Sequence, residues 1–315
     1  MTTPDQKPVN FSRRSFIRQG SIAGAGLMFT TPSWWNAGME MAKKPNSKYK
    51  GVQVGLITYS FRSMPHDIDQ LLKYIVESGI SAVELMGEAV EEFAGRPADN
   101  DRLAEWRANV PMDPFKAVKK KFRKAGVSIY AFKPSALGEK NTDAEIEYAL
   151  RAGKALGAQS VTVELPKNPE QSLRLGKLAE KHNMYIGYHN HTQATDTWWD
   201  VALDQSPNNT MNLDVGHYIA AGGNNTKETL LALIEARHDR ITSMHFKDRQ
   251  TKANGAANLP WGQGDTPLVE ILHLLRDKKY DIPVSIELEY PVPEGSNAVL
   301  EVIKCREYAK KALGA

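Results

Sequence analysis

The chain has 315 residues, of which 41% are hydrophobic and 24% are charged, an ordinary balance for a globular protein with a sizeable core. The mean hydropathy of −0.45 excludes a polytopic membrane protein. The 23 glycines and 17 prolines are too few for a collagen-like or low-complexity chain, and the single cysteine, Cys305, excludes an internal disulfide and a CxxC metal site.

The charge is unevenly distributed along the chain. Residues 1–50 contain eight basic and two acidic residues, so this segment carries +6 whereas the whole chain carries +3. The remaining residues therefore carry −3. Such a mildly acidic body argues against a nucleic acid-binding surface, which is usually basic.

The N-terminus resembles a twin-arginine export signal. The run Ser12-Arg13-Arg14-Ser15-Phe16-Ile17 precedes an apolar, small-residue stretch at 20–29. This stretch is too short for a stable membrane anchor, and no cysteine follows it for lipid attachment. We therefore predict an exported, periplasmic protein with a signal and linker at 1–48 and a folded domain at 49–315. A disordered basic tail is the alternative interpretation.

From residue 52 onward, short apolar runs alternate with amphipathic segments. Strands are predicted at 52–58, 82–86, 127–132, 160–164, 185–189, 211–215, 241–246 and 283–288. Helices are predicted at 67–78, 113–125, 143–156, 169–182, 226–237, 266–279 and 298–312, with a brief one near 197–204. The predicted helix N-caps include Asp67, Asp113 and Asp143.

Eight strand–helix units of this length predict a single-domain α/β protein, a (β/α)₈ TIM barrel. The alternative is an open doubly wound sheet, which usually shows a glycine fingerprint after its first strand, and residues 58–62 show none. The longer loops at 87–112 and 249–265 are expected at the C-terminal face of the strands, where they are candidate substrate walls.

Polar side chains stand at the C-terminal ends of the late predicted strands. They are Glu164, His189, His191, Asp214, His217, His245, Lys247, Asp248, Glu287 and Glu289. Singly, each is explained as a hydrogen-bonded core residue or a helix cap. Because neighbouring strand ends of a barrel meet at one mouth, the set predicts a divalent metal site. Mixed carboxylate and imidazole ligands suit Mn²⁺, Co²⁺ or Zn²⁺ better than Ca²⁺.

Four short sequence runs that contain these residues resemble the xylose-isomerase-like barrels of the sugar phosphate isomerase/epimerase group. They are Gly187-Tyr188-His189-Asn190-His191, Asn212-Leu213-Asp214-Val215-Gly216-His217, His245-Phe246-Lys247-Asp248 and Ser285-Ile286-Glu287-Leu288-Glu289, and the loop Gly262-Gln263-Gly264-Asp265 also matches. The resemblance covers residues 52–313. It implies a TIM barrel that binds one divalent metal ion and acts on a sugar or keto-sugar.

The resemblance also implies a set of metal ligands. Ketose epimerases of this group hold the metal with Glu, Asp, His and Glu from strands five to eight, and these positions fall on His189, Asp214, His245 and Glu287. The chain departs from the pattern at His189, where a carboxylate is usual. This departure puts simple two-base epimerization in doubt. Glu164, one strand earlier, is the candidate that would supply the missing carboxylate as ligand or base.

The chemistry implied by the resemblance is proton abstraction beside a carbonyl through a metal-stabilised enediolate. Glu287 is the first choice for the base and Glu164 the second. His217 resembles the substrate-contacting histidine of the family, and His191 is expected beside it. Asp248 is expected to orient His245 or to bind a sugar hydroxyl. Lys247 is expected to polarise a substrate oxygen or to form a salt bridge to a neighbouring loop.

Aromatic residues after the predicted strand ends suggest a sugar pocket. They are Tyr59, Phe61, Trp198, Trp199 and Trp261. The alternative is that they anchor loops in the core, which we expect of one of the paired tryptophans. Tyr59 and Trp261 are expected near the substrate.

Three functions stay open. The first is a metal-dependent sugar isomerase or epimerase. The second is a lyase or hydratase that acts on 3-keto-glycosides by elimination, which export favours because sugar phosphates are scarce outside the cytoplasm. The third is a non-catalytic periplasmic sugar-binding barrel. No nucleic-acid partner is expected, and no membrane contact after signal removal; homo-oligomerization through the outer helices is left open.

Overall fold

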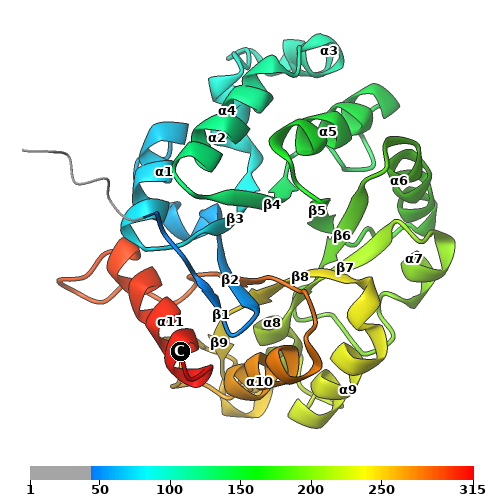
Figure 1. The fold of residues 1–315 in the computed structure, drawn as a ribbon. Helices are drawn as coiled ribbons and strands as arrows, with labels where there is room; N and C mark the ends of the chain where they lie inside the picture. The colour runs from blue at the N-terminus through cyan, green and yellow to red at the C-terminus, as the bar shows by residue number, and fades with distance from the viewer. Residues whose placement is uncertain (1–43) are drawn as a thin grey trace, which may run out of the picture. The chain divides into compact units, whose positions relative to one another are not determined.

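A computed structural model describes residues 44–315. The predicted export signal lies outside the described residues. Eight parallel strands close into a barrel surrounded by helices, which confirms the predicted TIM barrel (Figure 1). Among the described residues, no helix is long and apolar enough to cross a membrane.

Each predicted barrel strand is present, with bounds that differ from the prediction by at most two residues. The strands are β2 (Val52–Ile57), β3 (Ala82–Met86), β4 (Ser128–Lys133), β5 (Ser160–Glu164), β6 (Tyr185–His189), β7 (Asn209–Asp214), β8 (Ile241–Phe246) and β11 (Val284–Ile286). Neighbouring strands pair in parallel, and the pairing of β2 with β3 closes the ring. A two-residue strand, β1 (Lys48–Tyr49), pairs antiparallel with β2, so residues 48–49 belong to the sheet.

The predicted helices surround the barrel (Figure 1). They are α1 (Ile68–Glu77), α4 (Asp113–Lys124), α5 (Asp143–Leu156), α6 (Pro169–His182), α7 (Asp200–Gln205), α9 (Lys227–Arg237), α10 (Leu268–Lys278) and α11 (Ala298–Ala312). Asp67 caps α1 as predicted. The other two predicted N-caps are wrong. Thr142 caps α5 in a capping box with Glu145, and Met112 precedes α4 without a side-chain cap, so Asp143 and Asp113 are the first residues of their helices.

Several short elements were not predicted. The expected loop at 87–112 contains α2 (Gly87–Phe93), the 3₁₀ turn η3 (Asn100–Arg102) and α3 (Leu103–Asn109), whereas α8 (Val215–Ala221) follows β7 directly. The loop at 249–265 contains the 3₁₀ turn η5 (Lys252–Asn254) and a small hairpin of β9 (Asp248–Arg249) and β10 (Asn258–Leu259). The remaining 3₁₀ turns are η2 (Thr58–Phe61) and η4 (His238–Arg240).

A buried ion network holds the helical insertion after β3. The Arg107 guanidinium lies 3.0 Å from the Glu91 carboxylate and 3.4 Å from that of Glu145, and Tyr148 also donates to Glu91. All four side chains are buried. Because each carboxylate faces the guanidinium, the network ties α2 and α3 to α5 beside the barrel mouth.

The inside of the barrel is polar beneath the mouth. The Tyr130 ring packs against Gly55, so closely that a Cβ atom added to Gly55 would lie 2.7 Å from the ring. The Tyr130 hydroxyl forms a hydrogen bond of 2.5 Å with the Ser285 hydroxyl. Glu84 and Thr162 form a second interior contact at 2.7 Å. These layers form a hydrogen-bonded floor under the strand ends.

Candidate metal centre

The carboxyl ends of four consecutive barrel strands bring four buried side chains together. His189 ends β6, Asp214 ends β7, His245 lies on β8, and Glu287 follows β11. One potential ligand atom from each lies within 4.8 Å of the others. The strand register explains this convergence, because Asp214 is the direct partner of His245 and Ser285, two residues before Glu287, is its partner on the other side. These are the four residues that the sequence predicts as ligands.

The His245 ring lies between two carboxylates. Its Nδ1 atom is 2.8 Å from Glu287 Oε2 and 4.0 Å from Asp214 Oδ2, whereas its Nε2 atom is 2.8 Å from Glu84 Oε2. Burial favours the neutral ring, but Glu287 and Glu84 raise the pKa of His245 to about 10. In this arrangement the ring is therefore protonated on both nitrogens, with Nε2–H directed to Glu84 and Nδ1–H to Glu287, and Nδ1 would bind a metal ion only after losing its proton.

Asn212 fixes the tautomer of His189. The Asn212 amide nitrogen donates to Glu84 Oε2 and Ser243 Oγ, so its Oδ1 accepts from His189 Nδ1–H at 2.9 Å. This leaves His189 Nε2 as the ligand atom. Burial and the neighbouring His245 hold the pKa of His189 well below its usual range, so its ring is neutral.

Asp214 presents a buried oxygen that lacks a hydrogen bond. Its Oδ1 accepts from the His217 backbone N–H at 2.6 Å, where it also caps α8. Its Oδ2 accepts no hydrogen bond from any described residue, although Lys247 Nζ lies 3.0 Å away. Burial raises the pKa of this carboxyl. A buried carboxylate oxygen in this state is suited to a cation.

Together these observations fit a divalent metal ion. Two imidazoles and two carboxylates form the donor set, which suits Mn²⁺, Co²⁺ or Zn²⁺. Three of the four side chains are also held from outside the cluster, His189 by Asn212, His245 by Glu84 and Asp214 by the α8 backbone. Such outer partners orient metal ligands before the ion binds.

Glu84 is the member of this site that sequence reasoning missed. It lies in the middle of β3, is fully buried, and hydrogen-bonds Thr162, Asn212 and His245. Burial raises its pKa, but His245, Lys133 and Thr162 together lower it overall. The signal in the sequence is a single charged residue inside the apolar run at 82–86.

Lys247 lies inside the site and contacts three carboxylates there. Its Nζ atom is 2.7 Å from Glu287 Oε2, 2.8 Å from Glu289 Oε2 and 3.0 Å from Asp214 Oδ2. Burial opposes its charge, but these carboxylates raise the pKa of Lys247. The ammonium is therefore a buried cation among the candidate ligands, and its pairs with Glu287 and Glu289, which follow β11, are the salt bridge to a neighbouring loop that the sequence left open.

Two further histidines lie at the edge of the cluster. The His217 ring nitrogens face Lys247 Nζ at 3.1 Å and the Arg249 guanidinium, and burial together with Lys247 lowers the pKa of His217 to about 3. His191 is exposed, and its ring centroid lies 4.9 Å from that of His217 and 5.1 Å from that of His189. His189, His191 and His217 form a second, looser group of potential ligands.

Two residues predicted near the substrate lie at the rim. Glu164, at the end of β5, pairs with Lys133 at 2.9 Å, and its side chain is 49% exposed. It belongs to neither group of potential metal ligands, so the expectation that it completes the metal shell is not met. Tyr59 lies in η2 and is 37% exposed, with the Arg62 guanidinium over its ring.

Asp248 holds the loop after β8 rather than orienting His245. Its Oδ2 accepts from the backbone N–H groups of Gly262, Gln263 and Gly264, and its Oδ1 accepts from that of Thr266. Four backbone donors occupy this carboxylate, so Asp248 does not orient His245, and the alternative role of binding a sugar hydroxyl stays a prediction.

The tryptophans anchor loops. Trp261 is buried between Phe246 and Tyr308, with ring centroids 6.0 Å from each, so the prediction that it lies near the substrate was wrong. Trp199 is buried and donates to the Tyr188 carbonyl at 3.0 Å, as expected for one of the pair. Phe61 is also buried in the core, so Tyr59 is the exposed aromatic residue of η2.

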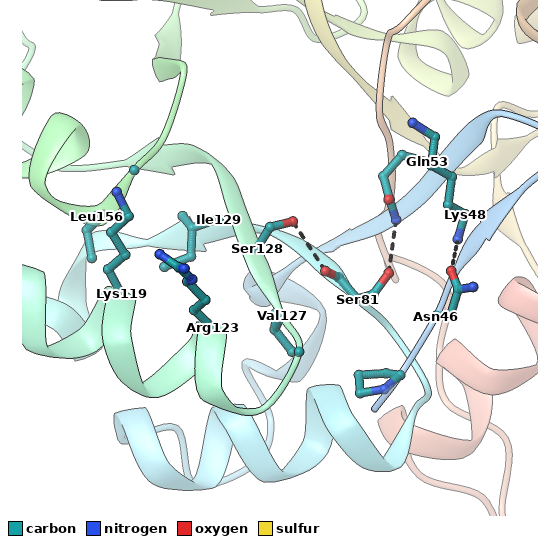
Figure 2. Close-up of a pocket in the computed structure, with 13 residues that line it drawn as sticks. Asn46, Lys48, Gln53, Ser81, Lys119, Arg123, Val127, Ser128, Ile129 and Leu156 are labelled. Carbon is teal, nitrogen blue, oxygen red and sulfur yellow. Dashed lines mark hydrogen bonds between the residues drawn. The ribbon is translucent and has the colours of Figure 1, made fainter. Parts of the chain in front are cut away.

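A separate cavity of about 490 Å³ lies at the opposite end of the strands. It is lined by Gln53, Ser81, Ser128 and two basic side chains of α4, Lys119 and Arg123 (Figure 2). Gln53 lies near the start of β2, and Ser128 is the first residue of β4. Since no predicted site residue lines this cavity, it is distinct from the metal centre.

Comparisons with known proteins agree with the fold. The family described as xylose isomerase-like TIM barrel matches residues 72–306. No curated protein matches the chain. A sugar phosphate isomerase/epimerase from Parabacteroides distasonis aligns with a TM-score of 0.58 and 20% identity, over 82% of this chain and 95% of that one.

Two further solved structures share the fold at lower identity. A xylose isomerase-like TIM barrel protein from Mycobacterium smegmatis in complex with magnesium aligns with a TM-score of 0.56 and 14% identity, over 83% of this chain and 96% of that one. An L-ribulose 3-epimerase aligns with a TM-score of 0.58 and 12% identity, over 84% of this chain and 95% of that one. At these identities the likeness shows the fold.

Proposed function

Because the chain belongs to the xylose isomerase-like TIM barrel family, we propose that it is a divalent-metal-dependent sugar isomerase or epimerase. One observation carries the proposal. His189, Asp214, His245 and Glu287 converge at the mouth, with one potential ligand atom from each within 4.8 Å of the others. The names of the structural neighbours, an isomerase/epimerase and an epimerase, support the same reaction class.

The reaction we propose begins with removal of a proton from the carbon beside a substrate carbonyl. When bound, a divalent ion would polarise that carbonyl and stabilise the negative charge that develops on its oxygen. Glu287 is the proposed base. Although burial opposes its charge, Lys247 and His245 hold the pKa of Glu287 well below its usual range, so the carboxylate is ionised. Glu164, at the rim beside Lys133, is the second candidate.

The mouth offers polar groups for sugar hydroxyls. The His217 ring is neutral, because burial and Lys247 suppress its protonation. Lys247 Nζ and the exposed ring of His191 complete a polar wall next to it. We propose that these side chains contact the substrate, together with Tyr59 at the rim. Tyr59 and Arg62 would limit the size of the sugar from the β2 side.

A lyase reaction on 3-keto-glycosides is the second candidate, favoured by one specific feature. His189 stands where a carboxylate would serve as the second base, and its Nδ1–H is committed to Asn212. The ring is neutral and buried, so it is poorly placed to reprotonate the opposite face. Loss of a β-substituent needs only one base, and Glu287 would supply it.

The test is hydrogen exchange into deuterated water, followed by NMR, with free ketoses and 3-keto-glucosides as substrates. The proposal predicts Mn²⁺-dependent deuterium incorporation beside the carbonyl, abolished in Glu287→Gln. An epimer as product supports the first reaction, and a released substituent supports the second. A non-catalytic sugar-binding barrel would bind the sugar without metal and without exchange. That result would overturn the enzymatic proposal.

We also propose that the protein is exported through the twin-arginine route to the periplasm. Support comes from the sequence at 12–29, where paired arginines precede a short apolar stretch. Replacing Arg13 and Arg14 with lysine is the direct test. Export predicts that the protein moves from the periplasmic to the cytoplasmic fraction, and an unchanged distribution would contradict it.

A further inference from the structure

Lys247 contacts the same carboxylate oxygens that face the His245 ring. Within the metal centre, the oxygens nearest His245 Nδ1 are Glu287 Oε2 at 2.8 Å and Asp214 Oδ2 at 4.0 Å. Lys247 Nζ lies 2.7 and 3.0 Å from these two atoms. The ammonium therefore sits against the carboxylates that would hold a metal ion.

Two cations cannot both make close contacts with these oxygens without strong repulsion. A divalent ion binds carboxylate oxygen at about 2.1 Å, so an ammonium in its present position would lie at most about 5 Å from the ion. The Lys247 side chain is 2% exposed, so water screens little of this repulsion. Lys247 and a metal ion would therefore compete for these carboxylate oxygens.

Glu289 provides the place to which the ammonium can move. Its Oε2 atom already lies 2.8 Å from Lys247 Nζ, and its side chain is 23% exposed, toward the mouth. Glu289 belongs to neither group of potential ligands, so its carboxylate stays available. His217 Nε2, 3.1 Å from Nζ and 3.7 Å from Glu289, lies beside the same position.

We propose that Lys247 is a resident cation of the metal centre, which competes with the divalent ion for Asp214 and Glu287 and thereby sets the metal affinity. The inference rests on the proposed function. In the metal-free protein the ammonium neutralises the clustered carboxylates. On metal binding it gives up its contacts with Asp214 and Glu287 and keeps the one with Glu289, which leaves a hydrogen-bond donor at the mouth, where the substrate enters.

The test is calorimetric titration of the chelator-treated full-length protein with Mn²⁺ alone. Lys247→Met removes the competing cation, so its Kd for Mn²⁺ is expected to fall about tenfold or more. Lys304→Met is the control, because Lys304 also pairs with a buried carboxylate, that of Glu301 in α11, but contacts none of the candidate ligands. The Kd of this control is expected to change less than about threefold.

A second variant tests whether Glu289 holds the Lys247 ammonium when a metal ion is bound. Glu289→Gln should weaken Mn²⁺ binding when Lys247 is present and should have a clearly smaller effect in the Lys247→Met background, because no ammonium then needs the carboxylate. Lys247→Gln repeats the first test with a polar side chain, and thermal unfolding with and without Mn²⁺ reports whether each variant is folded.

The outcomes separate the two proposals. If the wild-type protein binds Mn²⁺ and Lys247→Met shows an unchanged or higher Kd, the proposal that Lys247 competes with the metal ion is wrong. The proposed metal centre is then retained. Absence of Mn²⁺ binding to the wild-type protein and to every variant overturns the metal centre together with the competition.

Discussion

The Glu84 carboxylate lies 2.8 Å from His245 Nε2, on the side of the ring opposite to Glu287. This arrangement assigns the two ring nitrogens different tasks. Nε2–H is held by Glu84, and Nδ1 is turned toward Asp214 and Glu287. Carboxylates that hold the second nitrogen of a metal-binding histidine fix its orientation and increase its basicity.

We therefore predict that Glu84→Gln weakens metal binding about 10- to 100-fold, because the amide carries no charge and orients His245 less firmly. The measurement is the Kd for Mn²⁺ together with the visible spectrum of the Co²⁺-loaded protein, which reports ligand geometry. The matched control is Glu91→Gln, which also replaces a buried glutamate but lies in the Arg107 network. Equal Kd values for Glu84→Gln and the wild type would contradict the orienting role.

The Arg107 network predicts a pH dependence of stability. Burial raises the pKa of Glu145, but the Thr142 backbone, Asn141 and Arg107 lower it overall. A carboxylate whose pKa is lower in the folded state stabilises the protein above its unfolded pKa, about 4.3. This contribution is lost as pH falls through the folded pKa. Glu145→Gln should therefore lower the free energy of unfolding at pH 7 more than at pH 3.5.

Urea denaturation at both pH values measures this difference. Glu170→Gln is a suitable control, because Glu170 is an exposed residue in the first turn of α6. It should change the free energy of unfolding by a similar small amount at both pH values. A Glu145→Gln effect that is the same at pH 7 and pH 3.5 would contradict the assignment.

We expect Asp248 to stabilise the loop that it holds and to have little effect on metal binding. Asp248→Asn loses charge-assisted bonds to backbone donors, so we expect it to lower the free energy of unfolding by about 2–4 kcal/mol. It should also expose residues 260–266 to proteases while leaving the Kd for Mn²⁺ within about twofold. Asp265→Asn in the same loop removes an exposed carboxylate and should cost less stability. A tenfold loss of metal affinity in Asp248→Asn would instead support the role first expected from the sequence.

The sequence was sufficient to predict the barrel and the convergence of the strand ends. Continuous apolar runs marked the strands, and parallel strands place their ends at one mouth whatever the connecting helices do. His189, Asp214, His245 and Glu287 were therefore found together although they come from four different strands.

The details that sequence could not supply depend on side-chain direction and loop path. Glu84 lies in the middle of β3, and nothing in a buried apolar run tells which residues face the barrel interior. Asp248 and Trp261 follow strand ends, as true site residues do, but the β9–β10 hairpin turns them toward the loop and the outer helices. The helices α2 and α3 were missed because glycine, proline and mixed charges obscure their periodicity.

The central claim is that His189, Asp214, His245 and Glu287 hold one divalent ion. Anomalous X-ray diffraction at the manganese edge, from crystals grown with Mn²⁺, tests it most directly. The account predicts a single strong peak with ligand distances of about 2.0–2.3 Å to these four side chains. A peak held instead by His189, His191 and His217, or no peak at the mouth, would contradict it.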